Sequence, residues 1–295
     1  MTFSATEAAF EGFRVVRRHP LAILFWGLAY LLFFAAAFAL VGGPLATVMA
    51  TAKTLEEGQP GQQELMAFGQ SYFNLMAMIA PPMLIVGAIL NAAVARSVLS
   101  PSEKAFGYLR LGADELRVLA VSVILAIGFA ALFIILFTAV GVFAGLAAQA
   151  NAGVGVLVGI LLGLGAMAVS VWLAIRLSLA IPATMVEKRI APFSSFGLTK
   201  GRTLPLLGMG IIAVIMSLLV GFLSYIIALP IGLATGGLEQ LADMDGQSTM
   251  QILQAAAPGL IAWGVINAVS SALQLAVIYA PFSAAYRDLK GLPHE

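Results

Sequence analysis

Six continuous apolar stretches of about 20 residues limit what this chain can fold into. They cover approximately Leu21–Val41, Tyr72–Val94, Leu119–Gly141, Val154–Ile175, Leu206–Ala228 and Leu260–Ala280. A helix of about 20 apolar residues is long enough to cross the roughly 30 Å hydrocarbon core of a bilayer. None of the six alternates polar and apolar residues as a membrane-barrel strand does. The sequence therefore predicts an all-α, polytopic membrane protein with six transmembrane helices.

Composition excludes the main alternatives. The chain is 61% apolar and 10% charged, whereas soluble domains are roughly 45–50% apolar and about 25% charged. A soluble enzyme, a disordered segment and a nucleic-acid-binding domain are excluded because none could bury so much apolar surface. The chain has no Cys, and its two His residues, His19 and His294, lie near opposite ends. We therefore expect no metal or catalytic His site within the membrane and no cofactor.

The basic residues lie almost entirely on one side of the predicted membrane. Fourteen of the 15 fall in the N-terminal arm, the second and fourth loops and the C-terminal tail: Arg14, Arg17, Arg18, Arg96, Lys104, Arg110, Arg117, Arg176, Lys188, Arg189, Lys200, Arg202, Arg287 and Lys290. The opposite loops contain Lys53 against six acids: Glu56, Glu57, Glu64, Glu239, Asp243 and Asp245. Because short cytoplasmic loops carry the excess of Lys and Arg, both termini are predicted to be cytoplasmic.

Three segments that precede the odd-numbered helices resemble one another. Aligned on Gly12, Gly107 and Gly197, each has a neighbouring Phe and a basic residue two or three positions later. The pattern predicts three repeats within one membrane domain (1–295), at about 1–101, 102–190 and 191–295. Each repeat would consist of a short interfacial amphipathic helix followed by a transmembrane hairpin. The alternative is that Phe, Gly and Arg precede membrane helices by chance.

One stretch also resembles a known family. Arg176–Glu187 contains Pro182 and ends in Val186-Glu187, and Phe193–Arg202 ends in Lys200-Gly201-Arg202. This pattern resembles bacterial membrane proteins of the YciC type and is similar to the membrane domain of some glycerophosphoryl diester phosphodiesterases. The resemblance implies a six-helix protein of the bacterial inner membrane without an established catalytic residue. The phosphodiesterase domain that would supply chemistry is absent from this sequence.

Six basic residues are candidates for binding lipid headgroups, because they flank apolar segments at the predicted membrane surface: Arg14, Arg18, Arg110, Arg176, Lys200 and Arg202. Each base near an anionic leaflet contributes about 1 kcal/mol of attraction. Arg176 directly follows an apolar run, so it could pair with a lipid phosphate or with Glu187. Alternatively, the helix ends there and Arg176 extends to the membrane surface.

Polar and small residues within the spans form two further sets. The polar set could line a cavity or form hydrogen bonds between helices: Asn91, Ser217, Ser224, Asn267, Ser270 and Gln274. The glycines at four-residue spacing, Gly155, Gly159 and Gly163, predict close helix packing. The acids of the cytoplasmic loops, Glu103, Asp114, Glu115 and Glu187, are each near a base, and we expect surface ion pairs.

No nucleophile, acid or base stands with partners in a recognisable motif, so we expect no enzymatic activity. The leading hypothesis is a protein that binds or moves a membrane lipid or another amphiphile. The alternative is a non-catalytic accessory or scaffold subunit that packs against a membrane-protein partner or a second copy of itself. No nucleic-acid partner is expected.

Overall fold

The computed structural model describes residues 4–56, 61–102, 105–234 and 249–293, and these residues form helices and connecting turns. The helices, in chain order, are α1 (Ala5–Ala9), α2 (Glu11–Arg18), α3 (Pro20–Glu56), α4 (Gln62–Leu99), the 3-10 turn η1 (Ala105–Tyr108), α5 (Ala113–Ala150), α6 (Ala152–Leu177), α7 (Ala180–Glu187), α8 (Ser195–Thr199), α9 (Thr203–Ala234) and α11 (Thr249–Lys290). The loop residues Glu103, Lys104, Glu239, Asp243 and Asp245 lie outside the described residues.

Six helices in the described part of the chain are long and apolar enough to cross a membrane. Their candidate spans lie in Pro20–Leu45, Gln62–Leu99, Ala105–Ala150, Ala152–Glu187, Thr203–Ile231 and Ala257–Lys290. Each contains one of the apolar stretches that the sequence indicates. The prediction of an all-helical, multi-pass membrane protein is confirmed.

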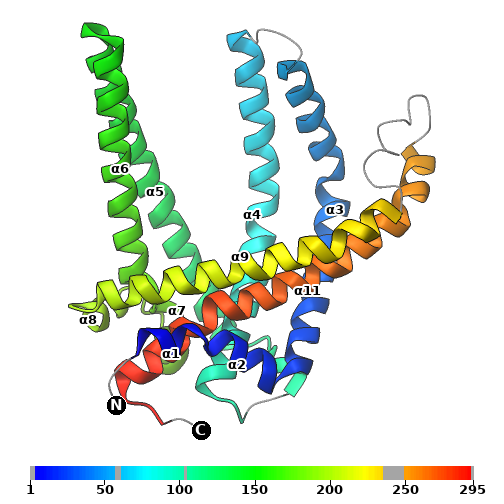
Figure 1. Ribbon diagram of the computed structural model, residues 1–295, viewed down its shortest axis with the longest axis vertical. Coiled ribbons are helices and arrows are strands. Elements are labelled where there is room, and N and C mark those ends of the chain that lie inside the picture. Colours follow the sequence, from blue (N-terminus) through cyan, green and yellow to red (C-terminus); the bar gives the residue numbers. More distant parts are fainter. Residues whose placement is uncertain (1–3, 57–60, 103–104, 235–248, 294–295) are drawn as a thin grey trace.

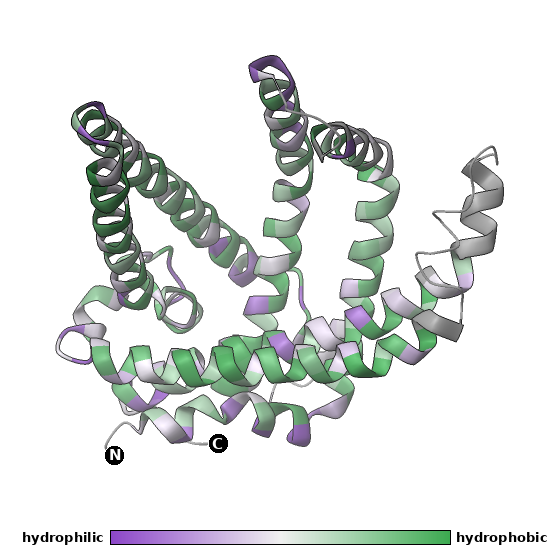
Figure 2. Cartoon of the chain, turned by 45° about the horizontal axis from the view of Figure 1, so that its top comes forward, coloured by the Kyte–Doolittle hydropathy of each residue, from purple (hydrophilic) through white to green (hydrophobic). Residues whose placement is uncertain are grey.

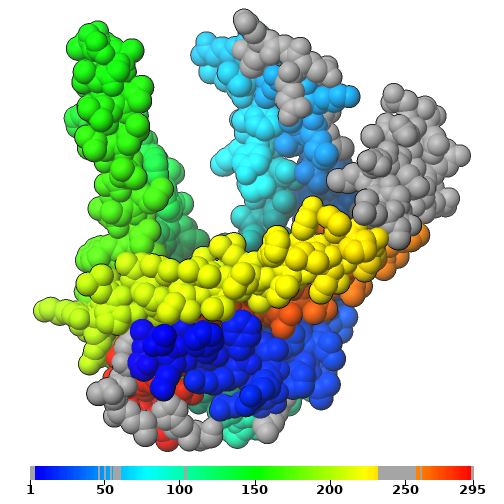
Figure 3. Space-filling model, viewed as in Figure 1, coloured from blue at the N-terminus to red at the C-terminus, as the bar shows by residue number. Residues whose placement is uncertain are grey.

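Each long helix packs against its neighbour in the chain, α3 with α4, α5 with α6, and α9 with α11, and α3 also packs extensively against α11. The first two pairs rise from a common base, and the third crosses that base above α1 and α2 (Figure 1). The outer part of α4 stands apart from α5 and α6 in the space-filling view (Figure 3). In the most apolar 18-residue stretch of α5, only 11% of the residues are buried within the protein. Hydrophobic residues cover most of these helices (Figure 2), as expected for a surface that faces lipid.

Helix α11 is the centre of the packed base, where it contacts α2, α3, α4 and α9. A row of alanines at four-residue spacing is buried along it: Ala268, Ala272, Ala276, Ala280 and Ala284. Small side chains allow helices to approach closely. At Gly12 of α2, a Cβ atom would stand 2.4 Å from the Val277 Cα, so only glycine fits this crossing.

The three segments expected to be interfacial amphipathic helices differ in structure. α1 and α2 are helical; they bury Ala8, Ala9 and Val15 in the protein core and leave Phe10 and Phe13 exposed. The expected helix before the second hairpin is wrong, since η1 is a tight turn with left-handed backbone at Phe106, Gly107 and Tyr108. The third segment contains only the five-residue α8. Local structure in these segments therefore follows tertiary contacts.

Of the three glycines predicted to allow close helix packing, Gly155, Gly159 and Gly163, two do so. A Cβ atom at Gly155 would lie 2.5 Å from the Ala148 Cβ, and one at Gly159 would lie 3.4 Å from the Ala144 Cβ. These two glycines therefore lie in the closely packed turn region between α5 and α6. Gly163 has no atom within 4 Å of its Cβ position and makes no such contact among the described residues.

Candidate functional site

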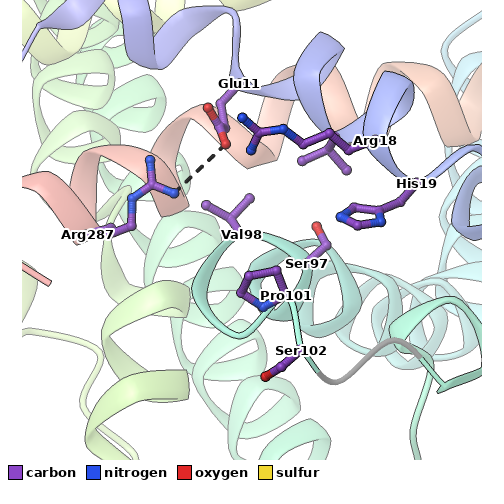
Figure 4. Close-up of a pocket in the computed structure, with 9 residues that line it drawn as sticks. Glu11, Arg18, His19, Ser97, Val98, Pro101, Ser102 and Arg287 are labelled. Atoms are coloured by element: carbon purple, nitrogen blue, oxygen red, sulfur yellow. Dashed lines mark ion pairs between the residues drawn. The ribbon is translucent and has the colours of Figure 1, made fainter. Parts of the chain in front are cut away.

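A cavity of about 440 Å³ opens at the base of the molecule, between α2, the end of α4 and the end of α11. We call it the basal cavity. Its lining consists of four ionisable side chains, two serines and three apolar residues (Figure 4). In that order they are Glu11, Arg18, His19, Arg287, Ser97, Ser102, Val15, Val98 and Pro101.

Arg287 on α11 is the most enclosed cation of this cavity, with 12% of its side chain exposed. Its Nη1 atom lies 3.9 Å from Glu11 Oε1, and its Nε atom lies 3.5 Å from Asp288 Oδ1. Charge-assisted hydrogen bonds of this kind are normally about 2.7–2.9 Å long. The buried Nε has no hydrogen-bond partner within the described part of the chain. Arg287 therefore retains unused hydrogen-bonding capacity.

Glu11 and Arg18 form the other charged wall. The Glu11 carboxylate is buried and accepts a hydrogen bond of 2.9 Å from Arg14 Nη1. The guanidinium groups of Arg18 and Arg287 approach Glu11 from different sides (Figure 4). Arg18 has no ion-pair partner among residues that the structure describes, and its side chain is exposed. Two arginines and one glutamate give this cavity a formal charge of +1, with His19 neutral.

Arg287 also lines two smaller cavities. One of about 290 Å³ adjoins Arg96, Lys188 and the C-terminal Pro293. The other, of about 130 Å³, contains Glu7, Arg14 and Asp288. Arg287 thus lies where three spaces meet, and polar groups from the N-terminal arm, α4 and α11 converge on it. Such a convergence can hold an anionic group by charge and hydrogen bonding.

A buried ion pair supports the base beside these cavities. Arg96 Nη2 and Glu115 Oε1 are 2.5 Å apart, and the two residues are 4% and 5% exposed. Arg96 Nη1 also donates to the Tyr108 carbonyl oxygen. Glu115 Oε2 accepts from the Gly112 backbone N–H at the start of α5. The expectation of a surface pair is wrong for Glu115, because its carboxylate is buried against Arg96 of α4.

The turn η1 closes one side of this region. Trp26 Nε1 on α3 donates a 2.7 Å hydrogen bond to the Gly107 carbonyl oxygen. The Tyr108 hydroxyl donates to the Pro101 carbonyl oxygen at 3.1 Å, and its ring meets His19 edge to face at 5.4 Å. These contacts hold Pro101 and His19, two lining residues of the basal cavity, against the core.

Of the six predicted headgroup residues, only Arg18 lines the basal cavity, and Arg14 lines its smallest neighbour. Arg110, Lys200 and Arg202 are exposed elsewhere. Arg176 lies over the Phe196 ring at 4.9 Å and near Trp172 at 5.8 Å. Glu187 pairs with Arg189 at 2.8 Å rather than with Arg176. α6 ends at Leu177, which agrees with the alternative that the helix ends beside Arg176.

The predicted polar intramembrane residues occupy two separate places. On α11, Gln274 Nε2 donates to Ser270 Oγ at 3.2 Å, and Gln274 packs against Gly221 of α9. Ser217 is buried on α9, Ser224 donates to the Val220 carbonyl oxygen, and Asn267 is half-buried. Asn91 on α4 lines a different cavity, with Tyr279 and Phe282 of α11. The structure does not bring the six together.

No motif in the sequence marks Glu11, His19 or Arg287 as a member of a site. The signal for Arg287 is weak but present, since it follows the buried alanine row of α11 at the helical spacing of Ala276, Ala280 and Ala284. When one face of a helix carries only small side chains for several turns and then an arginine, another helix packs closely against that face and encloses the arginine. Glu11, beside the close-packing Gly12, is its counterpart on α2.

Among the residues that the structure describes, no three His, Asp or Glu side chains are grouped so that they could hold a metal ion. In comparisons with known proteins, no protein-family model, no curated protein and no solved structure matches the chain.

Proposed function

We propose that this chain is a non-enzymatic protein of the bacterial inner membrane that binds an anionic phospholipid through its headgroup in the basal cavity. Both termini would be cytoplasmic, since 14 of the 15 basic residues fall on their side of the spans. The resemblance to YciC-type proteins, carried by residues 176–202, agrees with this location. Moving the lipid between leaflets would be an extension of the same binding.

The observation that carries the proposal is the state of Arg287. Its guanidinium is largely enclosed, its two carboxylate neighbours are 3.5 and 3.9 Å away, and its Nε makes no hydrogen bond within the described chain. Enclosing a cation without good hydrogen bonds is costly. A phosphate oxygen in the basal cavity would accept from this guanidinium and from Arg18, in the geometry that arginine prefers.

The depth of the cavity suits a lipid headgroup. Ser97 and Val98 line it three and four residues beyond Val94, the predicted end of the second apolar stretch. Helical rise places them about 5–6 Å past the hydrocarbon. The headgroup layer on each side of a bilayer is about 5–7 Å thick. A phosphodiester anchored in the inner leaflet would reach this level without leaving the membrane.

Three-fold repetition of a hairpin unit remains part of this proposal. The sequential pairing of α3 with α4, α5 with α6 and α9 with α11 supports it. The unlike conformations of α2, η1 and α8 mean that any repetition concerns the hairpins rather than the segments before them.

Lipid titration tests the proposal. Delipidated protein in detergent would be titrated with phosphatidylglycerol and with phosphatidylcholine, and bound lipid counted by native mass spectrometry. Arg18→Gln and Arg287→Gln should each weaken phosphatidylglycerol binding about tenfold, as loss of a charge-assisted hydrogen bond does. Arg117→Gln is the matched control, because Arg117 does not line the cavity and its Nη1 lies 2.6 Å from Asp114 Oδ1. Equal binding by all variants, or no headgroup preference in the parent protein, would contradict the proposal.

A second candidate is a scaffold that packs against a membrane partner or a second copy. The observation that favours it is the low burial of α4, α5 and α6. In the most apolar 18-residue stretch of each span, 17%, 11% and 17% of the residues are buried. A partner retained in stoichiometric amount in mild detergent, with no headgroup preference, would support this candidate over lipid binding.

A further inference from the structure

The cavity that Asn91 lines has a volume of about 340 Å³ and lies where α4, α5, α6 and α11 meet. Its walls come from α4, α5, α6, the start of α7 and α11, and most are apolar; the residues that matter here are Asn91, Phe129, Ala174, Ser178, Tyr279 and Phe282. We call it the intramembrane cavity. A small-molecule site typically has about 300–1,000 Å³ of mostly apolar space and a few polar groups.

Asn91 gives this cavity an unusual property. Its side chain makes no hydrogen bond within the described part of the chain, and its Oδ1 atom is buried. An amide carries both donors and an acceptor. Leaving such a group unpaired in an apolar setting costs about 1–3 kcal/mol on protein-based scales. The cavity therefore contains a polar group that needs a partner, surrounded by walls that favour a hydrocarbon.

The two cavities follow the same pair of helices. On α4, Asn91 lines the intramembrane cavity and Val98 lines the basal cavity; seven residues separate them, so they share a helix face. On α11, Ser283 and Arg287 line the two cavities four residues apart, again on one face. Helical rise puts the two levels about 6–10 Å apart. This offset is compatible with the headgroup and the chain region of one lipid.

From these observations we infer that the intramembrane cavity holds an acyl chain of a membrane phospholipid, with the ester carbonyl oxygen beside that chain accepting a hydrogen bond from the Asn91 Nδ2 amide. This inference rests on the proposed function and specifies where the apolar part of the ligand lies. The bilayer is the source of the chain, because the cavity lies between membrane-spanning helices. Phe129 and Phe282 would contact the methylene groups of the chain.

A filled cavity is the first test. Ala174 lines the cavity but is exposed on the open side, so Ala174→Phe introduces a ring without compressing the core. Ala168→Phe is the control, since Ala168 is also exposed on α6 and does not line the cavity. In a titration with phosphatidylglycerol and phosphatidylcholine, Ala174→Phe should lose at least tenfold in affinity for both lipids, whereas Ala168→Phe should bind as the parent protein does.

Removal of the amide is the second test. Asn91→Leu should weaken binding of both lipids about two- to tenfold, the range expected for one hydrogen bond. The same change removes an unpaired buried polar atom, so the unfolding midpoint of the lipid-free protein should stay the same or rise. Weaker binding together with a lower midpoint would instead indicate a structural role for Asn91 and would overturn its assignment to the ligand.

The outcomes separate the two proposals. Parent-like binding by Ala174→Phe, or equal loss in Ala168→Phe, would overturn the acyl-chain site. If the headgroup proposal alone is wrong, Arg18→Gln and Arg287→Gln would bind both lipids as the parent does, while Ala174→Phe would still reduce both. If the chain site alone is wrong, the arginine variants would lose their preference for phosphatidylglycerol and Ala174→Phe would have no effect.

Discussion

Trp26 and Gly107 are joined by a 2.7 Å hydrogen bond from the indole Nε1 to the backbone carbonyl oxygen, and the tryptophan is completely buried. The contact links α3 to the turn η1, 81 positions later. Because a buried carbonyl and a buried indole N–H need partners, this bond satisfies both groups. It fixes the turn that carries Tyr108, which in turn holds Pro101 and His19 at the basal cavity.

The first prediction concerns Gly107. Its φ of +65° is strained for other residues, and a Cβ there would lie 2.9 Å from the Phe25 Cβ and 3.0 Å from the Ala22 Cα. Gly107→Ala should therefore lower the free energy of unfolding in detergent by about 1–3 kcal/mol. Gly208→Ala is the control, since Gly208 is in α9 with no atom within 4 Å of its Cβ position. Equal stability of the two variants would show that the left-handed turn is not present.

The second prediction concerns the Arg96–Glu115 pair. Replacing either residue leaves the other charge buried, which costs about 3–5 kcal/mol. Arg96→Met and Glu115→Gln should each lower the unfolding midpoint strongly, and the double variant should recover part of the loss. Arg189→Gln, at a pair whose arginine is 70% exposed, should change stability by about 1 kcal/mol or less. A small effect of Arg96→Met would mean that this pair is solvated.

The number and approximate positions of the spans can be predicted from the sequence, because length and hydropathy alone determine whether a helix can cross a bilayer. The conformations of α2, η1 and α8 cannot be predicted from the Phe, Gly and basic residues that the three segments share. Gly12 is glycine because α11 passes against it. Gly107 is glycine because a Cβ there would press against Phe25 and Ala22 of α3, within a turn whose backbone is left-handed from Phe106 to Tyr108. Similar sequences thus form a helix crossing in one segment and a tight turn in the other.

The candidate site was harder to predict for a related reason. Basic residues that flank apolar stretches are expected to be exposed, and Lys200 and Arg202 are exposed. Arg96 and Arg287 are instead enclosed by helices distant in sequence, and burial of this kind depends on packing that a single sequence does not reveal. Only the alanine row of α11 indicated that something approaches Arg287 closely.

The third prediction concerns the crossing of α2 and α11. Gly12→Ala would place a Cβ 2.4 Å from the Val277 Cα and 2.6 Å from the Ala276 carbonyl oxygen, so α2 must move. We expect lower stability and weaker phosphatidylglycerol binding, since Glu11 and Arg18 move with the helix. Gly27→Ala meets its neighbours at an ordinary 3.7 Å and should affect neither property. If Gly12→Ala binds phosphatidylglycerol as the parent protein does, α2 does not contribute to the lipid site.

The fourth prediction concerns orientation. The chain has no Cys, so single cysteines can be introduced without a background. A membrane-impermeant thiol reagent added to intact spheroplasts should label Gly61→Cys, and it should label Lys200→Cys only after the membrane is opened. Labelling of Lys200→Cys in intact spheroplasts would reverse the proposed topology.

The most direct measurement is a density map of the protein purified with its native lipids. The proposed function predicts a compact phosphate-sized density in the basal cavity, within hydrogen-bond distance of Arg287 and Arg18. Arg287→Gln, imaged under the same conditions, should lose that density while retaining the fold. A basal cavity filled only by water, or closed by a shorter Arg287–Glu11 pair in the native protein, would contradict the account.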